Sequence, residues 1–430
     1  MMVLVVLMFL LLALLGMPLF TLLSAAALLG FYSNDTPLAV IGTELYRITQ
    51  TPVLLALPLF TVAGYLLSEG NSSQRLVRVT KALLGWMPAG LAIVSFTACA
   101  AFTAFTGASG VTIVALGALL YPALRQSGYP EWFSLGLVTT SGCLGLLLPP
   151  SLPLILYSII VQQMPQGAGV SIEHMFMAGL LPSLVFIILL SLFGLMVIRK
   201  QSLPTQPFSW KELGEALWEA RFELPLPLVV LGGIYGGLFA VSEAAAVTAL
   251  YALVVEVVIY RDISWQRLPK LAREAGVMIG GLLLVLACAM AFTNWLIDQE
   301  VPGRLFALVR AHVHSRYTFL LLLNIMLLVL GAFLDIFSSL VIMVPLLLPM
   351  AVGYGINPVH LGIVFLANMQ IGYLMPPIGM DLYIASYRFK RPIIDLVRAT
   401  WPFMLVLLCG VLILTYVPWL SLGLISGQHH

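Results

Sequence analysis

The chain alternates long apolar runs with short polar loops, and the length of each run predicts how often it crosses a membrane. A crossing helix needs about 20 apolar residues. We predict nine crossings, at about 2–29, 52–69, 131–162, 175–198, 225–240, 243–260, 275–297, 357–386 and 401–422. Because these runs are apolar throughout and lack the alternation of an outer-membrane barrel, they predict an all-α polytopic membrane protein.

Two further apolar stretches have polar or glycine-rich centres. Residues 86–126 carry "FTGASG" at Phe105–Gly110, and residues 317–352 carry "LDIFSS" at Leu334–Ser339. Each stretch is long enough to enter the membrane and turn back. We therefore predict a re-entrant hairpin over each stretch, with the polar centre at its tip.

Proline pairs interrupt two of the predicted crossings. Pro149–Pro150 lies within residues 131–162, and Pro376–Pro377 lies within residues 357–386. Proline removes a backbone donor and breaks a helix. Broken backbone at membrane depth is tolerated only where it is buried in protein or lines a cavity. These two crossings are therefore predicted to be broken helices beside a functional centre.

The proline pairs belong to an internal repeat with an offset of 227 residues, since 376 − 149 = 227. The same offset places Pro122 on Pro349, Gly128 on Gly355, Gly145 on Gly372 and Ser141 on Asn368. An odd number of predicted crossings separates the copies, so we predict inverted repeats, which are typical of secondary transporters. The predicted divisions are a first repeat at 1–200, a cytoplasmic linker at 201–224, and a linking helix with the second repeat at 225–430.

Composition and charge agree with a membrane protein and orient it. The 430 residues are 61% hydrophobic and 9% charged, with a mean hydropathy of +1.06; soluble proteins carry about 25% charged residues. If both hairpins return to the side they enter, 16 of the 20 Lys and Arg residues share one side, and the other side holds Arg47, Arg304, Arg310 and Arg316. The positive-inside rule then predicts a cytoplasmic N-terminus and a C-terminus on the opposite face. The net charge of +2 sits in short loops and indicates no nucleic-acid partner.

Two loops carry basic residues at every third position. We interpret both as amphipathic helices at the membrane interface, where they either anchor the protein by snorkelling or brace a moving domain. The residues concerned are Arg75, Arg78 and Lys81, then Arg267, Lys270 and Arg273.

The sequence lacks the residue patterns of an enzyme or a transition-metal protein. No Walker loop, zinc spacing, GxSxG elbow or dinucleotide fingerprint is visible. The four cysteines lie in apolar segments and are interpreted as small buried hydrophobes: Cys99, Cys143, Cys288 and Cys409. The histidines are scattered over loops and ends, and we assign none of them a metal: His174, His312, His314, His360, His429 and His430.

The breaks and tips together offer ligands for a cation. Each proline leaves preceding carbonyls without helical donors, and a carbonyl is a hard oxygen ligand. C-terminal ends of half-helices suit Na⁺, whereas N-terminal ends suit a carboxylate. We predict one cation site per repeat with an organic anion between them; the competing interpretation is that kinks and Ser/Thr back-bonding serve structure alone. The tips add the hydroxyls of Thr106, Ser109, Ser338 and Ser339.

Acidic residues at membrane depth are functional hypotheses by default. Asp335, at the second tip, is either a cation ligand or gate, or a helix N-cap. Asp381, four residues after the second proline pair, either faces a cavity or lies near a cytoplasmic helix end. Glu243 in "VSEAAAV" is interpreted as a helix cap, and Asn324 as a hydrogen-bond partner for a neighbouring helix.

Five segments in order resemble the large, DctM-like membrane subunit of tripartite ATP-independent periplasmic (TRAP) transporters. The resemblance spans essentially the whole chain. It implies a sodium-driven, elevator-type importer in the bacterial inner membrane, which receives an organic acid from a soluble periplasmic binding protein and assembles with a separate small four-helix membrane subunit. The segments are "GASGVTIVALGALLYPALRQSGY" (107–129), "GLLLPPSLPLILYS" (145–158), "SEAAAVTALYAL" (242–253), "GAFLDIFSSLVIMVPLLLP" (331–349) and "GINPVHLGIVFLANMQIGYLMPPIGMDLY" (355–383).

The same resemblance implies two groups of sodium- or substrate-binding residues. The first group is Gly107, Ala108, Ser109, Gly110, Ser141, Gly145, Pro149, Pro150 and Ser151, beside Thr106. The second group is Asp335, Ser338, Ser339, Asn368, Gly372, Pro376, Pro377 and Gly379, with Asp381 beside them. The chain departs from the family pattern at Ala108, where serine is frequent, and at Asp381, where asparagine is common.

Two alternatives to this function differ in class. One is a stand-alone dicarboxylate- or citrate-type sodium symporter that needs no binding protein. The other is an intramembrane enzyme, which would need a convergent nucleophile–base pair or metal set. The absence of such a set from the sequence favours transport.

Overall fold

The computed structural model describes residues 16–34, 52–87, 89–167, 169–199 and 208–425, with positions 8–9, 11–12, 37, 39, 42–43, 46 and 50. Over these residues the chain is helical and contains no strand, as the apolar runs predict. The first half contains α2 (Leu19–Ser33), η1 (Pro52–Leu55), α4 (Ala56–Glu69), α5 (Ser72–Leu84), α6 (Gly90–Thr106), α7 (Ser109–Gln126), α8 (Glu131–Ser141), η2 (Leu144–Leu147), α9 (Leu152–Gln162), η3 (Pro165–Gly167) and α10 (Ile172–Ile198). The second half contains α11 (Trp210–Glu219), α12 (Pro225–Tyr235), α13 (Val241–Leu253), the π-helix η4 (Val254–Ile259), α14 (Leu268–Asp298), α15 (Val301–His312), α16 (Arg316–Phe333), α17 (Ile336–Gly353), α18 (Pro358–Gly372), α19 (Met380–Phe389), α20 (Ile393–Tyr416) and α21 (Trp419–Leu422).

The helix boundaries keep the offset of 227 residues that the sequence shows. Moving α7 by 227 positions gives Ile336–Gly353, the bounds of α17. The pairs α6 and α16, α8 and α18, and α9 and α19 correspond within a few residues. Seven helices are long and apolar enough to cross a membrane, among those that the structure describes.

The two halves interlock at the centre of the bundle. The second arm of each hairpin packs against the helix that follows the break in the other half, so α7 contacts α19 and α17 contacts α9. In the same way α8 contacts α20, and α18 contacts α10. Every residue of α18 from Val359 to Gly372 is buried, and so are Phe133–Ser141 of α8 and Leu152–Val161 of α9. α8, α9 and α18 therefore lie in the core, as does the first break at Pro149–Pro150. The second break departs from this expectation: Pro376, Pro377 and Ile378 are exposed, and α19 buries only Asp381, Leu382 and Ala385.

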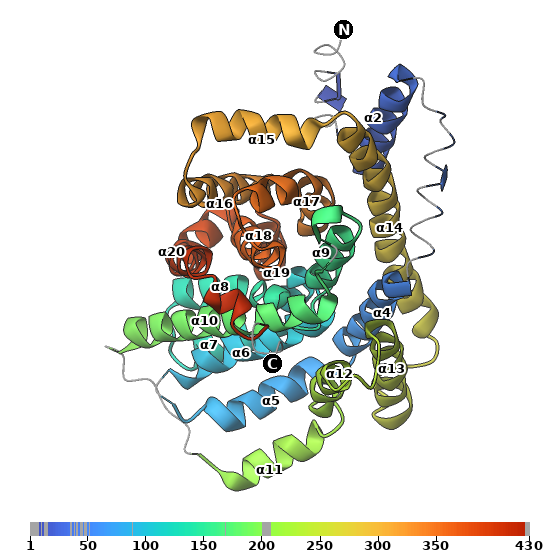
Figure 1. Cartoon of the computed structure of the whole chain (residues 1–430). Helices are drawn as coiled ribbons and strands as arrows, with labels where there is room; N and C mark the ends of the chain where they lie inside the picture. Colours follow the sequence, from blue (N-terminus) through green and yellow to red (C-terminus); the bar gives the residue numbers. More distant parts are fainter. Residues whose placement is uncertain are drawn as a thin grey trace.

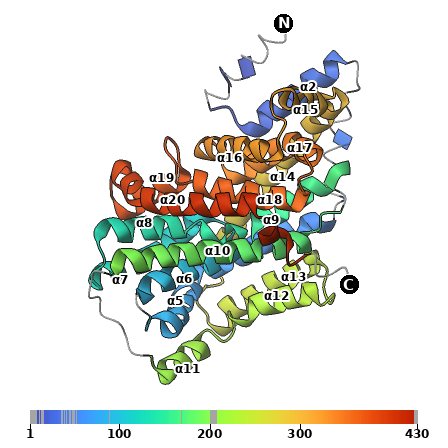
Figure 2. The same ribbon diagram turned by 60° about the vertical axis from the view of Figure 1, so that its left-hand side comes forward.

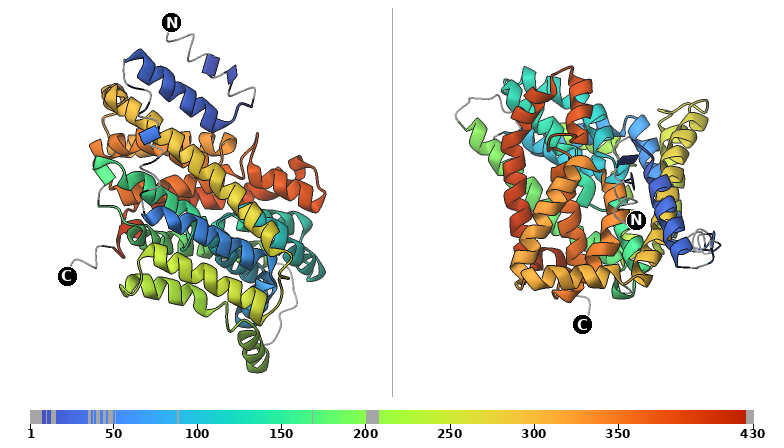
Figure 3. Two further views of the ribbon diagram at one scale, coloured as in Figure 1. Left: turned by 90° about the vertical axis from the view of Figure 1, so that its right-hand side faces the viewer. Right: turned by 90° about the horizontal axis from the view of Figure 1, so that it is seen from above.

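A second group of helices lies to one side of this bundle. Figure 1 shows α2, α4, α12, α13 and α14 along the right-hand side, with the hairpins and broken helices to their left. α4 packs on α13, and α14 packs on α2 and α4. The left view of Figure 3 shows the long α14 running obliquely across this side of the molecule.

The amphipathic helices lie near the ends of the long helices. Viewed with α10 and α20 running horizontally, α5 and α11 lie toward one end, and α15 and α21 lie toward the other (Figure 2). α5 carries Arg75, Arg78 and Lys81 on a helix of its own, as predicted. The other basic pattern was predicted wrongly as a separate interfacial helix: Lys270 and Arg273 belong to the first turns of α14, which continues without a break to Asp298.

Several predicted boundaries differ from the structure. The first crossing, predicted as one helix at 2–29, begins in residues that lie outside the described part, and it is interrupted at Gly16, whose φ of 83° is left-handed. α2 starts only after Pro18, because the residue before a proline is excluded from helix. The predicted linker at 201–224 is described only from residue 208, and it contains α11.

The predictions for the cysteine and histidine residues were also partly wrong. Three cysteines are buried as predicted, but Cys409 on α20 is exposed. His360 was assigned to a loop or end, yet it lies within α18 and is buried. Its ring nitrogens lie 2.6 Å from Ser421 Oγ and 3.2 Å from the Thr415 carbonyl oxygen.

Candidate functional site

The first hairpin turns at Gly107 and Ala108. α6 ends at Thr106, and Gly107 has φ of +65°, a left-handed conformation that glycine adopts without strain. A Cβ there would also lie 2.6 Å from Leu152 Cδ1 on α9. α7 then starts at Ser109 with no side chain capping its N-terminus, because the N-cap residue is Ala108. The first N–H groups of α7 therefore have no side-chain acceptor.

The second hairpin turns at Leu334 and Asp335, and its helix end is capped. Asp335 Oδ2 accepts hydrogen bonds from the backbone N–H groups of Phe337 and Ser338, both at 3.0 Å. The backbone N–H of Ile336 donates to Tyr373 Oη at 2.6 Å. The N-cap interpretation of Asp335 is thus confirmed, and its role as a cation ligand stays a prediction.

Both predicted breaks are present. α8 ends at Ser141, a 3₁₀ turn follows at Leu144–Leu147, and α9 starts at Leu152. α18 ends at Gly372, and α19 starts at Met380. Each break lies against the first arm of its own hairpin through corresponding glycines. A Cβ at Gly372 would lie 2.5 Å from Gly331 Cα, and a Cβ at Gly145 would overlap the backbone of α6 near Ala104.

Several buried polar atoms of the second copy have no hydrogen-bond partner. They include Ser339 Oγ on α17 and Asn368 Oδ1 on α18, both of which the sequence selects. Both side chains are fully buried. Buried oxygens without donors are costly in an apolar interior unless a ligand satisfies them. The second copy therefore contains buried oxygen atoms that could bind a cation.

Asp381 is fully buried, and it contacts the first hairpin tip rather than the second. Ser109 Oγ donates to Asp381 Oδ1 at 2.6 Å, and Asp381 Oδ2 has no partner. The sequence groups Asp381 with the second set of residues and leaves open whether it lies near a helix end. That grouping follows the repeat in the sequence; in space, the α7–α19 interface brings this carboxylate to the first tip.

The remaining predicted residues make mostly local contacts. Thr106 Oγ1 donates to the Phe102 carbonyl at 3.1 Å, and Ser141 Oγ to the Val138 carbonyl at 3.4 Å. Ser151 Oγ donates to the Leu146 carbonyl at 2.6 Å and so occupies one carbonyl of the first break. Gly110 lies against Ile384 of α19, and Gly379 has φ of 22° at the start of that helix. Ser338 is partly exposed at the second tip.

Other polar residues of the core were not selected from the sequence as ligands. Asn368 Nδ2 donates to Asn324 Oδ1 at 2.7 Å, and Asn324 Nδ2 donates to Thr415 Oγ1 at 3.1 Å. Asn324 thus bonds two neighbouring helices, as predicted. Gln370 is fully buried with neither amide atom partnered, and Tyr373 caps α17. Gln370 lies two positions after Asn368 in α18, and residues at that spacing do not share a helix face, so the sequence gives no signal that would select it.

One cavity connects both tips to the neighbouring helices α4 and α14. Its volume is about 700 Å³. One wall contains Gly107–Gly110, Asp335–Phe337 and Tyr373, and the other is built from α4 and α14, including Tyr65 and Met278. Glu69, Glu274 and Asp335 also line it, while none of its lining residues is Lys, Arg or His.

The charge of two of these carboxylates is already balanced. Glu69 Oε1 lies 3.0 Å from Arg267 Nη1, and Glu274 Oε1 lies 3.8 Å from Lys270 Nζ. All four side chains are substantially exposed. Among the described residues, the acidic side chains near the tips that have no ion pair are therefore the ones on the hairpin tips and beside the breaks.

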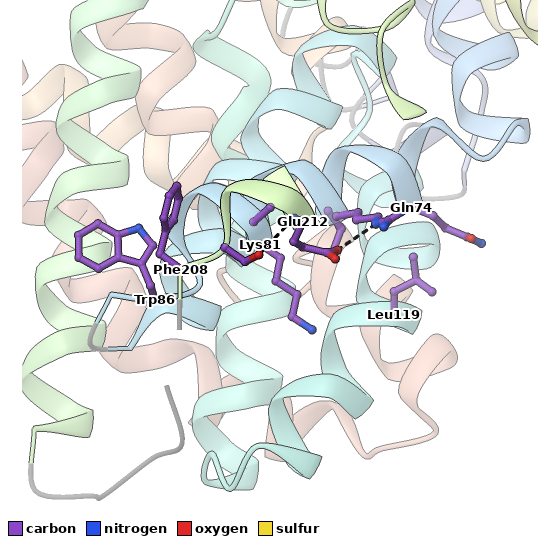
Figure 4. Close-up of a pocket in the computed structure, with 10 residues that line it drawn as sticks. Gln74, Lys81, Trp86, Leu119, Phe208 and Glu212 are labelled. Carbon is purple, nitrogen blue, oxygen red and sulfur yellow. Dashed lines mark hydrogen bonds and ion pairs between the residues drawn. The ribbon is translucent and has the colours of Figure 1, made fainter. Parts of the chain in front are cut away.

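A separate hollow of about 390 Å³ lies between α5, α7 and the segment before α11. Figure 4 shows Trp86 and Phe208 at one end, with Lys81, Glu212 and Leu119 along it. Arg78 and Glu212 in its wall are paired with each other at 3.1 Å. The hollow contains no residue of either tip, so the cavity between the tips is the stronger candidate for a transport site.

Comparison with known proteins places the whole chain in one family. Residues 5–420 match the family model described as "Tripartite ATP-independent periplasmic transporter, DctM component". The C4-dicarboxylate TRAP transporter large permease protein DctM of Rhodobacter capsulatus is 35% identical, over 92% of this chain and 91% of that protein. The ectoine/5-hydroxyectoine large permease UehC of Ruegeria pomeroyi is 32% identical over 96% of each chain. The sialic acid large permease SiaM of Vibrio cholerae is 30% identical, over 95% and 94%.

Solved structures of low sequence identity share the fold. The YdaH transporter of Alcanivorax borkumensis superimposes with a TM-score of 0.62 at 15% identity, covering 87% of this chain and 85% of that one. MtrF of Neisseria gonorrhoeae superimposes with a TM-score of 0.58 at 13% identity, covering 87% and 80%. At these identities the two structures show a shared fold.

Proposed function

The chain belongs to the DctM component family of tripartite ATP-independent periplasmic transporters, and from this premise we propose that it carries out sodium-coupled uptake of an organic acid. The family makes it a multi-pass large permease subunit of a TRAP transporter rather than an enzyme. Membership also implies a small membrane subunit and a periplasmic binding protein as partners. The proposed location is the inner membrane, with the N-terminus cytoplasmic and the C-terminus periplasmic.

The observation that carries this proposal is the meeting of both hairpin tips at one cavity between two groups of helices. Gly107–Gly110 and Asp335–Phe337 line the same cavity of about 700 Å³, which α4 and α14 close from the other side. A cavity at the contact between two bodies is where a solute can be held while one body moves past the other. We assign the cation sites to the two breaks and tips.

The cation sites rest on oxygen ligands. In the second site we place Asp335 with the unpartnered Ser339 Oγ and Asn368 Oδ1. In the first site we place Ser109 with carbonyl oxygens of the break at Pro149–Pro150. Small hard cations such as Na⁺ prefer carboxylate, carbonyl and hydroxyl oxygens over nitrogen and sulfur.

The substrate's acid group is assigned to the N-terminus of α7. Ser109 and Gly110 at this end of α7 line the cavity, and Ala108 offers the first N–H groups of the helix no side-chain acceptor. The corresponding end of α17 is already occupied by Asp335 and Tyr373. An uncapped helix N-terminus attracts an anion through its free donors and the helix dipole. Relatives named for C4-dicarboxylate, ectoine and sialic acid support a small organic solute.

Movement of one helix group past the other would carry the site across the membrane. We assign α6–α9 and α16–α19 to a mobile domain, because they interlock through α7–α19 and α9–α17. α4, α12, α13 and α14 are assigned to a scaffold that the small four-helix subunit enlarges. The placement of α5 and α15 toward opposite ends in Figure 2 supports two inverted repeats.

Uptake into proteoliposomes tests the proposal. The vesicles contain the large and small subunits, the binding protein is added outside with radiolabelled C4-dicarboxylate, ectoine or sialic acid, and an inward Na⁺ gradient is imposed. We expect uptake of one solute that needs both Na⁺ and the binding protein. Uptake that persists without the binding protein would favour the stand-alone symporter, and uptake indifferent to Na⁺ would refute sodium coupling.

A further inference from the structure

Asp381 is a fully buried carboxylate in the first turn of α19, and no basic side chain among the described residues pairs with it. Its exposed fraction is 0%, and no ion pair joins it to a Lys or Arg in the part of the chain that the structure describes. Oδ1 accepts from Ser109 Oγ at 2.6 Å, and Oδ2 has no partner at all. A buried carboxyl group must be paired, bind an ion or take up a proton. The unpartnered Oδ2 is a free oxygen acceptor that a bound cation would satisfy.

The offset of 227 residues shows why the second repeat supplies this charge. The residue of the first tip that corresponds to Asp335 is Ala108, since 335 − 227 = 108. The residue of the first repeat that corresponds to Asp381 is Leu154, since 381 − 227 = 154. The second tip thus has a carboxylate of its own, whereas the first tip has none. Asp381, which reaches the first tip from α19, restores one carboxylate per tip.

We propose that Asp381 binds the cation of the first site and is its counter-charge, so that the two sites carry one carboxylate each. This inference rests on the proposed function, because it deepens the assignment of the first cation site. The ligand is a monovalent hard cation, for which Na⁺ is the probe. Asp381 Oδ2 and the hydroxyl oxygen of Ser109 are its side-chain ligands, with backbone carbonyls completing the shell.

The position of Asp381 gives this cation a second effect. Through Ser109 its negative charge lies beside the uncapped N-terminus of α7, where the acid group of the substrate is assigned. Without a cation the carboxylate repels that group, and a bound cation removes the repulsion. Cation and substrate therefore favour each other's binding, which is the reciprocal coupling that symport needs.

Asp381 also joins the two tips through one hydrogen-bonded path. The backbone N–H of Asp381 donates to the Tyr373 carbonyl at 3.3 Å, and Tyr373 Oη accepts from Ile336 N–H at the second tip. Ser109 at the other end of the path is the first residue of α7. A cation held by Asp381 thus orders both tips together.

The test measures Na⁺ binding by the complex purified from the expressing membrane. Thermal stability is followed as Na⁺ replaces choline, and the Na⁺ concentration for half of the full shift is compared between variants. Asp381→Asn keeps the acceptor for Ser109 but removes the charge, so we expect the half-saturating concentration to rise about tenfold or more. Asp298→Asn, at the exposed end of α14, is the matched control and should leave it unchanged.

Further arms separate charge from structure. Ser109→Ala removes one neutral ligand and its hydrogen bond but leaves the charged ligand, so its shift should be smaller than that of Asp381→Asn; equal shifts would overturn the proposal, because the charge of Asp381 would then contribute no more than a neutral ligand. If Asp381→Asn does not fold, the wild-type complex is treated with dicyclohexylcarbodiimide and the labelled peptides are read by mass spectrometry. We expect Na⁺, and not choline, to protect Asp381.

The outcomes also distinguish the inference from the function beneath it. An unchanged Na⁺ dependence in Asp381→Asn, or labelling of Asp381 that ignores Na⁺, overturns the inference while sodium-dependent uptake by the wild type still stands. If the wild type shows neither Na⁺ stabilisation nor Na⁺-dependent uptake, the proposed function fails as well.

Discussion

Replacing Arg75 by methionine removes a guanidinium from a buried group of three carboxylates. Arg75, on α5, has an exposed fraction of 7%, and its partners Glu223, Glu256 and Asp262 are exposed by 4%, 0% and 13%. It lies 3.3 Å from Glu256 and 2.8 Å from Asp262, and its Nε donates to Glu223. It also stacks on the ring of Tyr260 at 3.9 Å. These contacts hold α5 against the linker, the π-helix η4 and the segment that follows η4.

The size of the effect follows from this burial. Removing one partner of a buried ion pair costs about 3–5 kcal/mol, because the other charge is left uncompensated. Methionine retains much of the side-chain volume, so the loss reports charge rather than a cavity. In a chain larger than a small domain, each kcal/mol of lost stability lowers the melting temperature by about 2 °C. The Arg75→Met variant should therefore unfold about 6–10 °C lower than the wild type. Fluorescence-detected size exclusion after heating in detergent measures this shift.

Arg78→Met is a matched control on the same helix. Arg78 also contacts three carboxylates, Glu212, Glu215 and Glu219, but all four side chains are exposed by 39% to 51%. Exposed ion pairs contribute less than about 1 kcal/mol, so the shift should stay below about 2 °C. Equal shifts in the two variants, or no shift for Arg75→Met, would refute the reasoning that burial decides the contribution of these charges.

Two further predictions concern packing and acid stability. Gly372→Ala places a Cβ 2.5 Å from Gly331 Cα, so it should destabilise the protein by about 1–3 kcal/mol, seen as a lower melting temperature; Gly276→Ala within α14, whose Cβ would meet nothing within 4 Å, is the control and should not lower the melting temperature, because alanine is favoured over glycine in a helix. Burial raises the pKa of Asp262, but the hydrogen bonds from Arg75 and Asn71 lower it by more than burial raises it. The pKa of Asp262 therefore lies below its usual range. A depressed pKa contributes stability above the unfolded value of about 3.9 that is lost as pH falls through the lower folded value. The gap in melting temperature between wild type and Asp262→Asn should therefore narrow as the pH falls below about 3.9; a gap that does not narrow there would contradict the assignment.

The features that the sequence predicted well are those with a local cause. Glycine at the first tip, Asp335 before the second hairpin's return helix, and the two proline pairs act on the backbone within a few residues. Their positions could therefore be read directly, and so could the 227-residue offset that relates them. Capping by Glu243 is another example, because its carboxylate accepts from the backbone N–H of Ala240 at 2.9 Å.

The features that could not be predicted depend on contacts between distant segments. Ser109 and Asp381 are 272 positions apart, and only the packing of α7 on α19 brings them together. The same holds for Arg75, which finds its partners in the linker and after α13. The spacing of basic residues at every third position was also ambiguous. In α5 it occurs on a separate short helix, whereas Lys270 and Arg273 lie in the first turns of the long α14.

The most direct test of sodium coupling is to measure Na⁺ and substrate entry in the same proteoliposomes. Radioactive Na⁺ and labelled substrate are followed together in vesicles that contain both membrane subunits, with the binding protein outside. The account predicts that each substrate molecule enters with a fixed number of Na⁺ ions, and that both fluxes stop when the binding protein is omitted. Substrate entry without accompanying Na⁺ entry would contradict it.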